Sequence, residues 1–270
     1  MKKYRIIDFH THPFTNAYTN ICVNQGECDM SKELSKSCLT QLGVEKICGS
    51  VISPSIRKHK PFLWEYTEEL NNMALELREY YQGFYIPGFH VHPGFVKESI
   101  KEIERMDKLG VKIIGELVQY MSKWDGYNYA SKELWEILEV AEHYGMIVDF
   151  HSGDNEEGMA SMDEMVKRFP KLILVGAHIG GDSSLVHHVK RLESSENYYV
   201  DIAASGLGEY GRLRFLMDRF GKERFIYGSD FPTCNESMFV SSLMFDDLFS
   251  EEEKEYVYFK NAARLLNIKD

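Results

Sequence analysis

The chain has 270 residues, 44% of them hydrophobic and 27% charged, a composition that predicts a packed globular fold and excludes a disordered chain. Its formal net charge is −11 at pH 7, and without a basic stripe to replace the counterions of a phosphate backbone we expect no nucleic-acid partner. No apolar run approaches the roughly 20 residues that a membrane helix needs, so we expect no membrane partner.

The cysteines indicate a reducing compartment. There are five, an odd number, and none forms a C-x-x-C pair. In a chain of this size they predict no disulfide framework and favour the cytoplasm. Asp8 and His10 interrupt the first apolar run, so we expect no signal peptide.

Short apolar runs alternate with longer stretches of helical period along the whole chain. The expected strands are Tyr4–Phe9, Val44–Ile52, Phe84–Val91, Val111–Val118, Met146–Phe150, Leu172–Ala177, Tyr198–Ile202 and Arg224–Tyr227. The expected helices are Ser31–Leu42, Trp64–Tyr81, Val96–Lys108, Ser131–Tyr144, Met159–Arg168, Leu185–Ser194, Glu209–Phe220 and Glu251–Ile268.

Eight alternating strands and helices predict an α/β fold with a parallel sheet covered by helices. The number of units favours a closed (β/α)₈ TIM barrel over a doubly wound open sheet. No G-x-G-x-x-G follows the first strand, so a dinucleotide site is not expected. Barrels of this kind have about 250 residues, and we therefore expect residues 1–270 to form one domain. The stretch between Pro13 and Met30 is expected to be a loop over the active site.

Ionisable side chains stand at the expected carboxyl ends of several strands, where TIM barrels place their active sites. His10 and His12 are two positions apart, so both imidazoles point to one face, and Asp8 shares that face and is expected to orient one of them. The ionisable residues that end other strands are Glu116, His151, His178 and Asp230. Histidines with carboxylates suit zinc first, and also manganese, iron or cobalt.

The remaining histidines and the loop residues have plainer interpretations. His90 and His92 form a second H-x-H pair, which we consider a less favoured metal-ligand pair than His10 and His12. His92 is a candidate substrate contact. We interpret His59, His143, His187 and His188 as surface residues. Arg57, in a short basic loop that we expect to be solvated, could bind a substrate carboxylate. Trp124 could contact a planar part of the substrate.

In six segments the chain resembles the amidohydrolase superfamily, and especially its amidohydrolase-2 branch. The resemblance covers nearly the whole length. The segments that carry it are IIDFHTHPF, YGMIVDFHSG, FPKLILVGAHIGGDS, YYVDIAAS, RFIYGSDFP and YFKNAARLLNI.

This resemblance implies roles for the strand-end residues. His10, His12, His151 and Asp230 match metal ligands, and Asp230 matches the general base. His178 matches a histidine that polarises the substrate in single-metal members and binds the second ion in two-metal members. Glu116 departs from many members of the branch and resembles the metal-bridging glutamate of metal-dependent deoxyribonucleases. One ion or two stays open, with a preference for two.

The main hypothesis is a hydrolase that uses metal-activated water on a small-molecule amide, ester or lactone. One alternative is a decarboxylase or hydratase of a small aromatic or unsaturated acid at the same site, which release of CO₂ would distinguish. A second is a metal-dependent phosphodiesterase or deoxyribonuclease, which Glu116 favours and the acidic charge opposes. A third is a metal-binding barrel without catalysis.

The oligomeric state stays open. A methionine- and phenylalanine-rich segment near the C-terminus would suit either a helix packed on the barrel or an interface between copies of the chain. Its residues are Met238, Phe239, Met244, Phe245 and Phe249.

Overall fold

The computed structural model describes residues 4–14, 31–52, 61–153, 155–205 and 207–269. Within them, eight strands form one parallel sheet in the order of the sequence. The strands are β1 Ile6–Asp8, β2 Val44–Gly49, β3 Tyr85–Phe89, β4 Ile113–Leu117, β5 Ile147–His151, β6 Ile173–Ala177, β7 Tyr198–Asp201 and β8 Phe225–Ile226. Seven lie inside their predicted ranges and β5 extends one residue beyond its range, to His151, so the periodicity argument is confirmed.

The sheet closes between its first and last strands. The backbone N–H of Phe9 donates to Tyr227 O (2.9 Å), and beyond the strand ends the N–H of Asp230 donates to His10 O (2.8 Å). The N–H of His12 donates to Phe231 O (2.7 Å). These bonds join the segments after β1 and β8, and the fold is a (β/α)₈ TIM barrel, as the sequence predicts.

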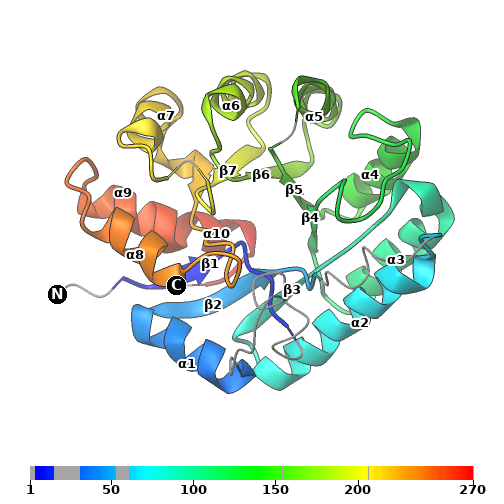
Figure 1. Cartoon of the computed structure of the whole chain (residues 1–270), viewed down its shortest axis with the longest axis horizontal. Helices are drawn as coiled ribbons and strands as arrows, with labels where there is room; N and C mark the ends of the chain where they lie inside the picture. Colours follow the sequence, from blue (N-terminus) through cyan, green and yellow to red (C-terminus); the bar gives the residue numbers. More distant parts are fainter. Residues whose placement is uncertain (1–3, 15–30, 53–60, 154, 206, 270) are drawn as a thin grey trace.

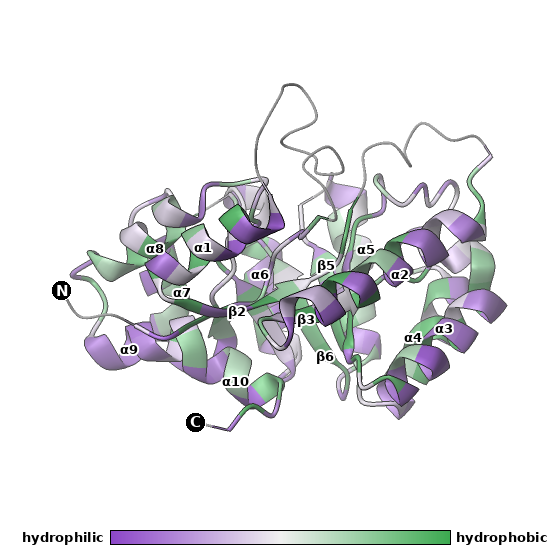
Figure 2. Cartoon of the chain, turned by 90° about the horizontal axis from the view of Figure 1, so that it is seen from below, coloured by the Kyte–Doolittle hydropathy of each residue, from purple (hydrophilic) through white to green (hydrophobic). Residues whose placement is uncertain are grey.

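Helices surround the sheet (Figure 1). They are α1 Lys32–Leu42, α2 Trp64–Tyr81, α3 Val96–Lys108, α4 Lys132–His143, α5 Glu156–Arg168, α6 Asp182–Ser194, α7 Arg212–Phe220, α8 Glu236–Met244, α9 Glu251–Glu255 and α10 Asn261–Leu265. Short turns η2 Pro93–Phe95, η3 Lys222–Arg224 and the π-helical η4 Tyr256–Lys260 complete the elements. Figure 2 shows hydrophilic residues along α3 and α4, whose buried residues face the barrel.

Helix ends follow local signals in the sequence. The Ser31 hydroxyl accepts the N–H of Leu34 (3.0 Å) and starts α1, as an N-cap does. Gly43 ends α1 with φ +102°, a left-handed conformation that favours glycine. The methionine- and phenylalanine-rich segment forms α8 and the turn after it; Phe239 and Phe249 are buried, whereas Met238 and Phe245 are exposed.

Strand β5 shows how the barrel interior changes along its length. Ile147, Asp149 and His151 alternate on one face of the strand. Ile147 belongs to an apolar cluster that takes one side chain from each of seven strands and ends on η4 and α10. Asp149 is buried above this cluster, and His151 reaches the carboxyl end. The interior is therefore apolar at the amino ends of the strands and ionisable at their carboxyl ends.

In the part of the chain that the structure describes, no helix combines the length and apolarity that a bilayer crossing requires. The expected active-site loop, residues 15–30, and the basic loop with Arg57 and His59 lie outside the described residues.

Candidate metal centre

The six residues that end the predicted strands come together at the carboxyl end of the barrel. All except His151 are at least nine-tenths buried. These residues and Asp201 form three overlapping groups, and within each group the nitrogen and oxygen atoms that could bind a metal lie within 4.8 Å of one another. These groups are His10, His12 and Asp230; Glu116, His151 and His178; and His10, His178 and Asp201.

Glu116 stands between two pairs of imidazoles. Its Oε2 lies 3.5 Å from His10 Nε2 and 3.3 Å from His12 Nε2. Its Oε1 lies 2.9 Å from His151 Nδ1 and 3.4 Å from His178 Nε2. Each oxygen therefore faces its own pair, an arrangement that would let one carboxylate bridge two ions.

The imidazoles of His10 and His12 have fixed orientations. Nδ1 of His10 is bonded to Asp201 Oδ2 (2.8 Å), and Nδ1 of His12 to Ser50 O (3.0 Å). Because these partners are acceptors, each Nδ1 carries the proton. The two Nε2 atoms then face each other at 3.3 Å. Asp230 Oδ1 lies 3.4 Å from His12 Nε2. Two nitrogen lone pairs and carboxylate oxygens that face one point fit a divalent metal ion, and such outer partners are usual for histidine ligands.

The electric field at the centre favours a cation. Burial alone would lower the pKa of His10, but the carboxylates of Asp201 and Glu116 outweigh it and raise that pKa well above its usual value. Burial alone would raise the pKa of Glu116, but the charge of His10 and hydrogen bonds from the imidazoles hold it well below its usual range. Carboxylate charge is therefore stable here, and a metal ion would neutralise it.

Two of the six residues have unusual backbones. His178 has φ +66° and Asp230 has φ +62°, a left-handed conformation that costs a residue other than glycine about 1–2 kcal/mol. Such strain gathers at functional sites. The surrounding bonds fix both residues, since the N–H of His178 donates to Asp201 Oδ1 (3.0 Å) and that of Asp230 to His10 O (2.8 Å).

Asp8 holds the backbone of the centre rather than an imidazole. It was expected to orient one of the first histidines, and this is wrong. Its Oδ1 accepts the backbone N–H groups of His10 (3.2 Å) and Ser229 (3.0 Å), and its Oδ2 accepts the Ser229 hydroxyl. Asp201, which ends β7, orients His10 instead. Its position at a strand end is the signal that could have identified it.

Asp149 is a second residue that the sequence argument missed. Both of its carboxylate oxygens are buried without a hydrogen-bond partner among the described residues, and Oδ2 lies 3.9 Å from His10 Nδ1. Burial raises its pKa well above the usual value. It shares one face of β5 with His151, a pattern visible in the sequence.

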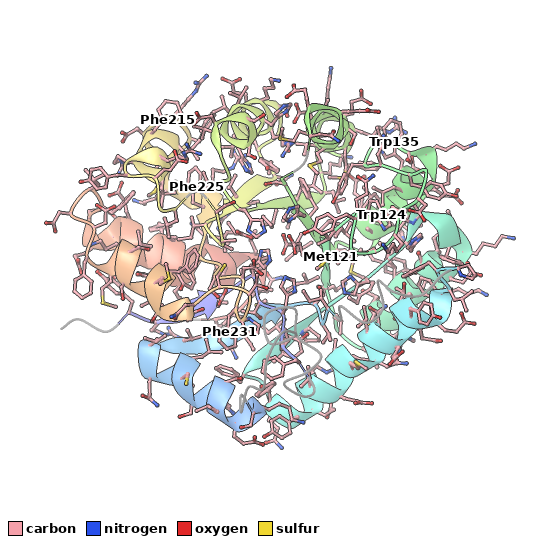
Figure 3. The ribbon with its side chains drawn as sticks, viewed as in Figure 1. Met121, Trp124, Trp135, Phe215, Phe225 and Phe231 are labelled. Carbon is pink, nitrogen blue, oxygen red and sulfur yellow. The ribbon has the colours of Figure 1, made fainter. Side chains whose placement is uncertain are left out.

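A cavity of about 490 Å³ adjoins this end of the barrel, between the loop after β4 and the start of α5. Tyr120 and Trp124 line it from the loop, and Asn155 and Glu157 from the start of α5. The Tyr120 ring stands edge-on to the ring of His151, with centroids 5.7 Å apart. Figure 3 shows Trp124 on the side of α4 and Phe231 close to β1.

The candidate substrate contacts have different positions. His92 stacks on Phe62 with ring centroids 4.9 Å apart, and its Nδ1 accepts the N–H of Gly94. The Trp124 ring lies 6.4 Å from that of His92 and also lines the cavity. Arg57 lies outside the described residues. His90 donates from Nε2 to Val51 O (2.8 Å), and burial lowers its pKa to about 4, so it is a neutral interior residue.

His187 and His188 were expected on the surface, and both are buried on α6. His187 Nδ1 lies 2.6 Å from Asp163 Oδ2. His188 lies within hydrogen-bonding distance of Tyr198 and of the carbonyl of His178. Their partners lie on α5, on β7 and just after β6, and the sequence pattern of α6 does not reveal these contacts with other elements.

Solved structures with the same fold include three decarboxylases. The 5-carboxyvanillate decarboxylase of Sphingomonas paucimobilis is 15% identical with a TM-score of 0.72, and the alignment covers 98% of this chain and 99% of that one. The 2,6-dihydroxybenzoate decarboxylase of Rhizobium is 11% identical with a TM-score of 0.75 and the same coverage. The 5-carboxyvanillate decarboxylase of Novosphingobium aromaticivorans, complexed with manganese and a nitrobenzoic acid, is 14% identical with a TM-score of 0.70, covering 98% and 96%.

At these identities the structural likeness establishes the fold alone. No curated protein matches the sequence. The amidohydrolase family model, by contrast, matches residues 7–268, a range that contains every residue of the centre. With a TIM barrel whose carboxyl end carries a donor set suited to a divalent metal, the chain belongs to the amidohydrolase family.

Proposed function

We propose that this protein is a metal-dependent enzyme that removes CO₂ from a small aromatic or unsaturated carboxylic acid. The metal centre rests on one observation: the convergence of four imidazoles on the two oxygens of Glu116. The decarboxylases among the structural neighbours support this reaction better than the hydrolysis of an amide, ester or lactone, which the sequence placed first.

The ions would be held at two ends of Glu116. His10, His12 and Asp230 would bind one ion with Glu116 Oε2, and His151 and His178 would bind the other with Oε1. Manganese is the first metal to test because a structural neighbour contains it, with zinc next. When bound, a divalent ion would supply positive charge that orients the acid and stabilises negative charge as it develops.

We assign the proton transfer of this reaction to the carboxyl group of Asp230. In its acid form, Asp230 would give its proton to the carbon that bears the carboxylate group. The bond from that carbon to the carboxylate then breaks, its electron pair restores the unsaturated system, and CO₂ leaves. Asp230 regains a proton from water for the next turnover.

The test is release of CO₂ from aromatic acids by manganese-loaded protein, with 2,6-dihydroxybenzoate and 5-carboxyvanillate as first substrates. We expect Asp230→Asn to lower kcat by about 10²–10⁴-fold, the usual effect of losing a positioned acid or base. Asp218→Asn, at an exposed position on α7, is the matched control. Loaded protein that releases no CO₂ from any acid, yet cleaves esters or lactones, would refute the decarboxylase.

A two-metal hydrolase is the second candidate, because Glu116 faces two pairs of imidazoles. In that reaction Asp230 would take a proton from the attacking water and pass it to the leaving group. Lactones and phosphoesters offered to the same preparation test it. Incorporation of ¹⁸O from labelled water into the product would establish hydrolysis.

A further inference from the structure

His178 is held by its backbone as well as by its place at the end of β6. Its φ of +66° is unfavourable for a side-chain-bearing residue, and both polar groups of its backbone have partners. Its N–H donates to Asp201 Oδ1 (3.0 Å). Its carbonyl accepts the Nε2–H of His188 (2.8 Å) and the hydroxyl of Ser152 (3.0 Å). These bonds decide where the His178 imidazole points.

The partner on α6, His188, is itself fixed. It is fully buried, and its Nδ1 lies 2.7 Å from the Tyr198 hydroxyl. Because the carbonyl of His178 can only accept, the proton of His188 is on Nε2, and Nδ1 accepts the hydrogen bond from Tyr198. The rings of His188 and Tyr198 stack, with a 26° angle between their planes. Burial and the charge of Arg191 lower the pKa of His188 to about 3, so the ring is neutral.

The barrel wall makes room for this pair. A Cβ at Gly176, two positions before His178 on β6, would lie 2.0 Å from Tyr198 Oη and 3.2 Å from His188 Cε1. Glycine is thus required at position 176, where the His188 side chain of α6 passes β6 to reach the carbonyl of His178. The arrangement crosses three elements, β6, α6 and β7, and ends at the metal centre.

We propose that His188 is a positioning residue for His178, with Tyr198 selecting the tautomer that lets it act. The bond to the carbonyl keeps His178 left-handed, and this directs its Nε2 toward Glu116 Oε1, 3.4 Å away. The inference rests on the proposed function in one respect, that His178 binds a metal ion. A buried histidine that only stabilises the fold would not affect the metal centre.

The experiment compares cobalt-loaded variants by visible absorption, which reports ligand geometry, and by cobalt affinity in competition with a chelator. In His188→Gln the amide N–H can replace the Nε2 donor, and we expect the wild-type spectrum and an affinity within about 3-fold. In His188→Asn the amide is too short, and we expect a changed spectrum with an affinity about 10–100-fold lower, the usual effect of losing an outer partner. Tyr198→Phe should change the spectrum less, with Tyr199→Phe as its matched control.

Three outcomes decide the matter. A wild-type spectrum and affinity in both His188→Asn and Tyr198→Phe, with only the melting temperature lowered, would overturn the proposal. His178→Ala is measured alongside. A wild-type spectrum in that variant would show that His178 is not a metal ligand, and the inference would then fail because the ligand assignment is wrong. If His188→Asn does not fold, Tyr198→Phe and the rescue by glutamine decide alone.

Discussion

Glu116 is the residue on which we expect the number of bound metal ions to depend. Its two oxygens face different imidazole pairs at 2.9 to 3.5 Å, and it is 4% exposed. A carboxylate in that place can share its charge between two ions. If Glu116 bound a single ion, the other pair of imidazoles would have no shared carboxylate with which to bind a second ion.

We therefore expect Glu116→Ala to bind one equivalent of metal where the wild type binds two. The remaining ion should stay with His10, His12 and Asp230, which keep their own partners. Elemental mass spectrometry after loading with manganese measures this. Glu136→Ala, on the exposed side of α4, is the control and should bind two. One equivalent in all three proteins would show that Glu116 does not bridge.

Single residues also show what a sequence can predict about a site. His10, His12 and Asp230 could be placed because each ends a strand, and strand ends meet at one mouth in a barrel. Asp201 also ends a strand, but any of several buried carboxylates could orient one histidine. The choice between Asp8, Asp149 and Asp201 depends on the three-dimensional positions of the strands, which the sequence pattern does not give. His188 lies on a helix, where the pattern does not reveal which strand residue it meets.

At the scale of elements, β4 shows how a close backbone approach requires glycine. Gly115 precedes Glu116 with φ +105°, and a Cβ there would lie 2.0 Å from the carbonyl oxygen of Asp149 on β5. Glycine at this position lets β4 approach its neighbour closely, and the strand register shifts between Ile114 and Leu117. Glu116 directly follows this close contact, and its carboxylate faces the imidazoles of the centre.

Gly115→Ala should therefore lower the free energy of unfolding by more than about 3 kcal/mol, as severe backbone clashes do. Gly110→Ala is the matched control, because Gly110 also has a positive φ (+73°) but no atom within 4 Å of an added Cβ. We expect it to cost only about 1–2 kcal/mol, the left-handed penalty alone. Urea unfolding compares the two; equal losses would show that the contact with Asp149 is unimportant.

Element boundaries were harder to predict than element order. The alternation of apolar runs and helical stretches placed all eight strands, because burial imposes the pattern. The ends depend on turns: β8 has only two residues, Phe225 and Ile226, since the chain then bends to form the seam with β1. The expected C-terminal helix from Glu251 to Ile268 contains a π-helical turn, which the pattern does not signal.

At the scale of the whole molecule, neutral buried histidines make stability depend on pH. His188 has a folded pKa of about 3, below the value of about 6.5 in an unfolded chain. Above pH 6.5 both states are neutral and stability is complete. As the pH falls from 6.5 toward 3, only the unfolded chain gains the proton, so the free energy of unfolding falls by up to about 1.4 kcal/mol per pH unit.

The matching experiment measures urea unfolding of metal-free protein between pH 7.5 and 4.5. In His188→Gln the free energy of unfolding should fall less steeply with decreasing pH in this range, by a slope that corresponds to the uptake of up to one proton. His143→Gln, at an exposed position on α4, should keep the slope of the wild type. Equal slopes for wild type and His188→Gln would mean that His188 does not bind its proton differently in the two states.

The seam between β1 and β8 has a consequence for how the protein is made. His10 and Asp230 are bonded through their backbones yet stand about 220 residues apart in the sequence. At a ribosomal rate of about 5–20 residues per second, roughly 10 to 45 seconds separate their synthesis. The first two histidines thus emerge long before the aspartate that completes their group, and until then they are open to any metal in the surroundings. On the proposed ligand set, the complete site exists only once the seam has closed, so selection between divalent ions takes place in the finished barrel.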